Sequence, residues 1–158
     1  MDSAYRRLQA HISINSRLGT ARADFDTLMK VWSHSNLKIE RKYEIFQACI
    51  SSKLLCCLHT TWLRKAEVNK LNAFQSRCIR KLIGVKPSYW SRVSNQTVLQ
   101  TVGAKPFSQM LLQQQLQYFG DIARRPTGHV LRDMIFQASN TNLVQVPGPR
   151  RKGRPRNT

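Results

Sequence analysis

Apolar residues recur every three or four positions through most of this sequence, and this spacing restricts the fold more than any other feature of the chain. In residues 18–32, for example, Leu18, Ala21, Phe25 and Trp32 fall on one narrow stripe of an α-helix. A helix of this kind is stabilised by packing its apolar stripe against other helices. We therefore expect an all-α fold, with about six helices in an irregular bundle.

Capping residues divide this pattern into separate helices. Gly84 should end the third helix, because glycine readily adopts the left-handed conformation that closes a helix C-terminus. Ser94 should cap the next helix, since its hydroxyl can accept a hydrogen bond from a backbone N–H of the first turn. Pro126 should end the fifth helix. The expected helical ranges are residues 18–32, 39–58, 66–83, 95–101, 106–125 and 128–138.

The two ends of the chain differ from its middle. Residues 1–17 are weakly patterned, and we expect a weakly structured segment there, with a short strand at residues 10–14 as an alternative. Residues 18–138 form the expected helical domain. Residues 139–158 are first polar and then basic, and are expected to be a disordered tail.

The charge balance points to a polyanionic partner. Lys and Arg total 26 against eight Asp and Glu, which gives a formal net charge of +18 spread along the whole chain. Nucleic acid is the expected partner, and an anionic membrane surface is the competing one. The sequence has neither a long apolar run nor the apolar core of a signal peptide, so we expect a nuclear or cytoplasmic protein without a transmembrane segment.

The last twelve residues, 147–158, contain three prolines, two glycines and five cations but no acidic residue. This composition forms neither a helix nor a core. Its centre, Lys152–Arg156, resembles an AT-hook, a short motif whose arginines enter narrow A·T-rich minor grooves. Generic binding of the same cations to phosphates is the alternative. The candidate binding residues of the tail are Arg150, Arg151, Lys152, Gly153, Arg154, Pro155 and Arg156.

A second group of cations lies on the third expected helix. Lys70, Arg77 and Lys81 are seven and eleven residues apart, so they align on one strip of its surface, with Arg80 beside them. Glu67 is the only acidic residue nearby. The strip is therefore a candidate phosphate-binding surface, and an ordinary solvated basic face is the alternative.

Catalytic and metal-binding patterns are missing from the sequence. A polymerase or nuclease needs clustered carboxylates, but only Asp24 and Asp26 are close, and an i, i+2 pair points to different faces of a helix. Cys56, Cys57 and His59 fit no zinc spacing, and the four cysteines are expected to be buried free thiols. We therefore expect no catalytic residue, no metal site and no cofactor.

Several ordered motifs cover nearly the whole chain. They are Ile50–Leu55 continuing to Thr61-Trp62-Leu63, then Leu71–Gly84, Arg92–Asn95 with Val98-Leu99, Gln115–Arg124 and the basic tail. In order and spacing, over about residues 17–156, this set resembles the C-terminal portion of LINE-type (non-LTR) retrotransposon reverse transcriptases, just after the polymerase palm.

The resemblance implies a thumb-like helical region and a following linker that grip template and primer. It also implies that the carboxylates of the RNA-directed DNA polymerase lie in an upstream domain, so that this chain is not an enzyme on its own. The sequence departs from the family at Cys56-Cys57, where an aromatic–glycine pair is usual, and at His59, where an acid is usual. Gln117 and Asp121 stand where the family often has Arg and His, which removes positive charge there.

Three functional interpretations remain at this point. The first is a non-catalytic reverse-transcriptase fragment that binds RNA, DNA or their hybrid through basic helix faces and the tail. The second is a stand-alone AT-hook-like protein on A·T-rich duplex DNA. The third is an inert, truncated copy of the element.

Overall fold

The computed structural model describes residues 3–61, 63–137 and 142–144, with side chains from Ile14 onward. The described residues contain helices and one isolated antiparallel bridge, between Phe136 and Leu143, but no strand, so the all-α prediction is confirmed. The chain divides into two compact units, Met1–Leu116 and Gln117–Thr158, which are described separately below.

The first unit begins with a long helix, α1 (Ser3–Ser33). It occupies the positions where a weakly structured segment, or a strand at residues 10–14, was expected. The apolar stripe extends further toward the N-terminus than the pattern suggested, because Ile14 is buried and lies one turn before the buried Leu18. The same stripe continues through Phe25 to Trp32, whose rings pack edge to face at 6.3 Å.

The second expected helix consists of three consecutive segments. They are α2 (Ile39–Phe46), a π-helical turn η1 (Gln47–Ser51) and α3 (Ser52–Leu55). Phe46 and Ile50 are fully buried. The run ends before residue 58, because Cys57 adopts a left-handed conformation (φ 60°) and starts the 3₁₀ turn η2 (Leu58–Thr60).

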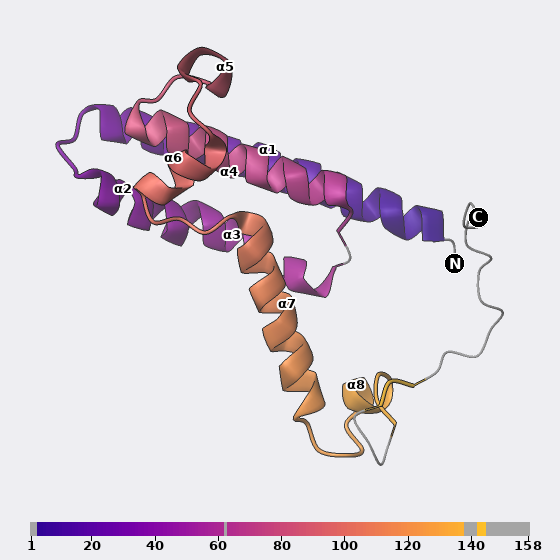
Figure 1. Cartoon of the computed structure of the whole chain (residues 1–158). Coiled ribbons are helices and arrows are strands. Elements are labelled where there is room, and N and C mark those ends of the chain that lie inside the picture. Colours follow the sequence, from indigo (N-terminus) through magenta and orange to yellow (C-terminus); the bar gives the residue numbers. More distant parts are fainter. Residues whose placement is uncertain (1–2, 62, 138–141, 145–158) are drawn as a thin grey trace, which may run out of the picture. The chain divides into compact units, whose positions relative to one another are not determined.

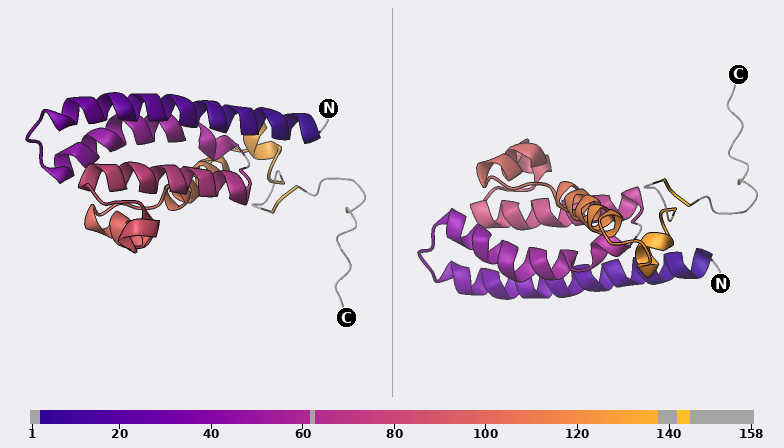
Figure 2. Two further views of the ribbon diagram at one scale, coloured as in Figure 1. Left: turned by 90° about the horizontal axis from the view of Figure 1, so that it is seen from above. Right: turned by 90° about the horizontal axis from the view of Figure 1, so that it is seen from below.

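The third expected helix is α4 (Lys65–Ile83), and Gly84 closes it with a φ of 71° as predicted. It packs against both α1 and α2, and Figure 2 shows these helices as neighbours. An aromatic chain joins the elements: Phe46 packs edge to face on Phe25 at 5.9 Å and stacks on Phe107 at 6.5 Å. The hydrophobic core of the unit therefore lies between α1, the α2–α3 run and α4.

Two short helices follow α4. The segment between the expected helices at residues 66–83 and 95–101 contains α5 (Ser88–Ser91), which projects from the neighbouring helices in Figure 1. The next helix, α6 (Asn95–Thr101), has the predicted bounds, and the Ser94 hydroxyl accepts a hydrogen bond from the backbone N–H of Thr97 at 3.1 Å. It packs on α4 with Val98 and Leu99 buried.

Side chains of α4 fix the start of α7 (Phe107–Ala123). The buried amide of Gln75 accepts a hydrogen bond from the backbone N–H of Phe107 and donates one to the carbonyl of Lys105, both at 2.8 Å. The amide oxygen of Asn72 accepts from the backbone N–H of Ser108 at 2.9 Å. The bonds from Phe107 and Ser108 satisfy N–H groups that a helix N-terminus leaves without intrahelical partners.

The second unit begins within α7 and contains α8 (Val130–Asp133), which is much shorter than the helix expected at residues 128–138. Its capping acceptor is the imidazole Nδ1 of His129, which accepts a hydrogen bond from the backbone N–H of Leu131 at 3.3 Å. Phe119 and Phe136 pack together at 5.4 Å, and Phe136 is buried. In the part of the chain that the structure describes, no helix has the length and apolarity to span a bilayer.

Candidate nucleic-acid interface

Two helices that are distant in the sequence meet along a regular polar row. On α1 and α4, side chains 55 positions apart face each other: Asn15 with Lys70 and Asp26 with Lys81. Because later residues of α1 meet later residues of α4, the two helices run parallel. The α1–α4 seam, as we call it, consists of Asn15, Arg22, Asp26, Lys70, Arg77 and Lys81.

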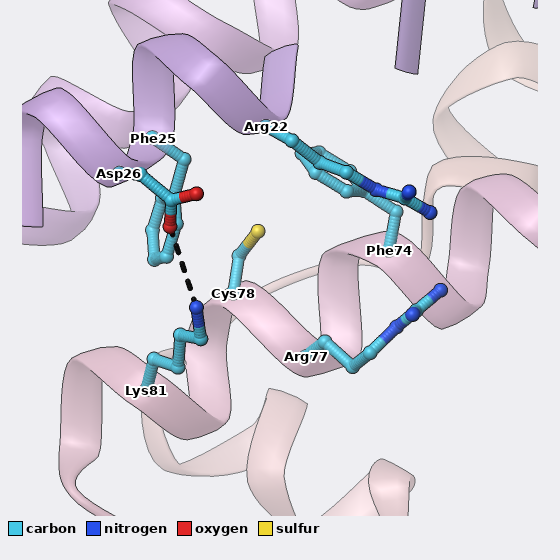
Figure 3. A pocket seen from close by; sticks show the side chains of 7 residues that line it. All are labelled: Arg22, Phe25, Asp26, Phe74, Arg77, Cys78 and Lys81. Atoms are coloured by element: carbon cyan, nitrogen blue, oxygen red, sulfur yellow. Dashed lines mark hydrogen bonds and ion pairs between the residues drawn. The ribbon is translucent and has the colours of Figure 1, made fainter. Parts of the chain in front are cut away.

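A pocket of about 250 Å³ opens at the middle of this seam (Figure 3). Buried side chains of both helices line it, namely Phe25 from α1 with Phe74 and Cys78 from α4. Charged side chains complete the lining: Arg22, Asp26, Arg77 and Lys81. The pocket therefore combines an apolar lining with three cations and a single carboxylate.

Of the three cations that line this pocket, Arg22 and Arg77 are the ones available to bind a ligand. Their guanidinium groups extend in the same direction on one side of the pocket in Figure 3. Within the described residues Arg22 makes no hydrogen bond or ion pair, and Arg77 donates only from Nε to the carbonyl of Ala73 in its own helix, at 3.1 Å. Two exposed guanidinium groups on one pocket favour an anion, because each can donate two parallel N–H bonds to phosphate oxygens.

Lys81 and Lys70 are engaged by seam partners. The ammonium of Lys81 lies 3.3 Å from the Asp26 carboxylate and 5.8 Å from the centre of the Phe25 ring. Exposed ion pairs of this kind contribute about 1 kcal/mol or less, so a phosphate can compete for the lysine. Lys70 donates to the side-chain oxygen of Asn15 at 3.3 Å. All three cations that the sequence placed on one strip are exposed along the seam.

Arg80, the fourth candidate cation, expected beside this strip, does not belong to the exposed surface. It is only 5% exposed, because it lies on the side of α4 that packs against the segment after Gly84. Its guanidinium donates five hydrogen bonds to neutral oxygens at 2.6–3.3 Å. The acceptors are the Asn95 side chain (two bonds), the Ser91 hydroxyl and the carbonyls of Lys86 and Val93. Arg80 is a structural anchor for that segment.

Arg22 was missed at the sequence level. Its helix was predicted, but nothing in one helix shows which residues of another will face it. The only signal is its spacing four residues before Asp26, which places both on the same side of α1.

The two close aspartates have separate partners, as their spacing predicted. Asp24 pairs with Lys53 of α3 at 2.7 Å, whereas Asp26 pairs with Lys81 of α4. They therefore point toward different helices. No group of three or more His, Cys, Asp or Glu side chains with metal-binding geometry occurs among the described residues.

The cysteines differ from the expectation of buried thiols at three positions. Only Cys78 is buried, and burial raises the pKa of its thiol to about 12. Cys49, Cys56 and Cys57 are free and exposed, and the latter two follow the end of the helical run at Leu55.

The candidate residues of the basic tail lie outside the residues that the structure describes. They are Arg150, Arg151, Lys152, Gly153, Arg154, Pro155 and Arg156.

Comparison with known proteins gives no relative for this chain: no family model matches it, and neither do curated proteins or solved structures at a significant level. The resemblance to LINE-type reverse transcriptases therefore stays a prediction from the sequence motifs.

Proposed function

We propose that this chain binds nucleic acid through the α1–α4 seam, as a non-catalytic, thumb-like segment of a LINE-type retrotransposon reverse transcriptase. The observation that carries the proposal is that Arg22 and Arg77, from separate helices, line the same pocket. The only carboxylate that lines this pocket, Asp26, is already paired with Lys81. A phosphate of RNA, DNA or a hybrid has the charge and geometry to bridge the two guanidinium groups. A nuclear or cytoplasmic location and an upstream polymerase domain belong to the same proposal.

The structure of α4 adds support to this proposal. Two buried polar residues of the helix, Gln75 and Arg80, hold the neighbouring segments, while the exposed Lys70, Arg77 and Lys81 line the seam. The helix is thus fixed in place by side chains that do not compete for the ligand. A fixed basic surface loses little conformational freedom when it binds phosphates.

The proposal is tested by titrating a fluorescent DNA hairpin with the protein at several salt concentrations. The double variant R22Q/R77Q should bind more weakly, and its log–log salt slope should be shallower by about 1, because each phosphate contact contributes about 0.9. K38Q/K105Q is the matched control, since it removes two exposed cations outside the seam.

Three results would count against the proposal. Equal losses in the two double variants would mean that net charge alone, and not the seam, sets the affinity. A wild-type protein that binds no nucleic acid would favour the inert element copy. Strong preference for A·T over G·C duplex, unchanged in R22Q/R77Q, would favour the stand-alone AT-hook protein.

A further inference from the structure

Two large aromatic side chains stand exposed on α5, well outside the seam. Tyr89 is 85% exposed and Trp90 is 74% exposed. Their rings pack edge to face, with centroids 5.6 Å apart and an interplanar angle of 87°. The two rings thus contact each other and leave most of their surface exposed to solvent, although the core of this unit buries other aromatic rings completely.

The backbone that carries this pair is anchored on both sides. The buried guanidinium of Arg80 donates to the carbonyl of Lys86, before α5, and to the carbonyl of Val93, after it. It also reaches the hydroxyl of Ser91 within α5. Arg92 then ends the short helix in a left-handed conformation (φ 54°). Both ends of the segment are therefore tied to α4, and the exposure of the rings follows from a backbone that is hydrogen-bonded in place.

The charge around the pair favours an anionic partner. Lys86 and Arg92 flank the rings and are exposed, and the sequence contains no acidic residue between Glu67 and Asp121. Insertion into a lipid surface would need an amphipathic helix with a broad apolar face, but α5 has four residues and its other two are serines. Aromatic rings combined with nearby cations are typical of surfaces that stack unpaired bases and contact the adjoining phosphates.

We propose that Tyr89 and Trp90 form a stacking platform for unpaired nucleobases of single-stranded nucleic acid, with Lys86 and Arg92 contacting the adjoining phosphates. Arg80 is the positioning residue that holds the platform. The inference rests on the proposed nucleic-acid binding, and it adds a second site with a different chemistry. The α1–α4 seam binds backbone phosphate, whereas the platform binds the bases themselves and accepts any base sequence.

The test compares two single strands of equal length and charge: oligothymidylate and a strand of abasic sites. The wild-type protein should bind oligothymidylate at least about fivefold more tightly, since stacking of one base contributes about 1–3 kcal/mol. Y89A/W90A should lose this preference while keeping its affinity for the abasic strand. Y89F/W90F should retain most of the preference, because its rings still stack.

L112A/L116A is the matched control, since it removes two exposed apolar side chains from α7, and it should keep the preference. Circular dichroism establishes that each variant is folded. Equal wild-type affinity for both strands would overturn the platform but leave the proposed function intact, whereas no binding to either strand or to the hairpin would overturn both. The platform would also be overturned if L112A/L116A lost the preference as well. The same holds if Y89A/W90A lost affinity for anionic vesicles but kept its preference for oligothymidylate.

Discussion

Arg77 and Arg80 are three positions apart on one helix, yet they have different physical roles. Arg77 is exposed and uses one N–H on its own helix, whereas Arg80 is buried and donates five hydrogen bonds. A buried cation is tolerated only when its donors are satisfied. The fixed fork of a guanidinium reaches several acceptors at once, which an ammonium cannot do.

The substitution R80K should therefore destabilise the protein although it preserves the charge. We expect the free energy of unfolding to fall by about 2 kcal/mol or more, because several hydrogen bonds to a charged donor are lost at a buried position. R77K, the matched control, should change it by less than about 0.5 kcal/mol. Urea denaturation of both variants measures the difference, and equal effects would contradict the anchoring role of Arg80.

Thiol chemistry distinguishes Cys78 from the other cysteines. Its raised pKa, about 12, means that the reactive thiolate is scarce throughout the range from pH 7 to pH 10. An Ellman titration at pH 8 should therefore detect three thiols in the folded protein and the fourth only after denaturation. C78A is the control: it should give three thiols in both states. Rapid reaction of all four thiols in the folded wild-type protein would contradict the burial of Cys78.

At the scale of elements, most helix ends could be predicted because they depend on local chemistry. Gly84 ends α4 and Ser94 caps α6, as their residue types predicted. Gly84 does so through a left-handed φ and Ser94 through its hydroxyl. The burial of Arg80 and the role of Arg22 could not be predicted, because each depends on which element packs against its helix. The extent of α1 was also missed, since a single buried residue per turn, such as Ile14, is a weak periodic signal.

The contact between α4 and the start of α7 is an element-scale feature that mutation can test. Q75L should lower the free energy of unfolding by about 2 kcal/mol, because the buried N–H of Phe107 and the carbonyl of Lys105 lose their partners. Q109L changes the same residue type at an exposed position of α7 and should have little effect. Equilibrium denaturation gives both values. Similar stabilities of the two variants would show that the Gln75 hydrogen bonds contribute little.

At the scale of the whole molecule, two of the proposed phosphate-binding regions, the seam and the tail, differ in their chemistry. The seam holds its cations on two packed helices, and the strip of Lys70, Arg77 and Lys81 could be predicted because it lies within one helix. The tail holds five cations within residues 147–158 with no apolar residue beside them. If the seam and the tail contact different phosphates, their contributions to the salt dependence of binding should add.

Deleting residues 147–158 should therefore make the log–log salt slope on duplex DNA shallower by up to about 4.5, since each of five cations contributes about 0.9 when it neutralises a phosphate. Combining the deletion with R22Q/R77Q should flatten the slope further, by the amount that R22Q/R77Q produces alone. Anisotropy titrations of A·T-rich and G·C-rich hairpins measure the slope and the base preference together. An unchanged slope after the deletion would place all contacts on the helices. A preference for A·T that disappears with the tail would assign groove recognition to it, because phosphate contacts alone do not distinguish base pairs.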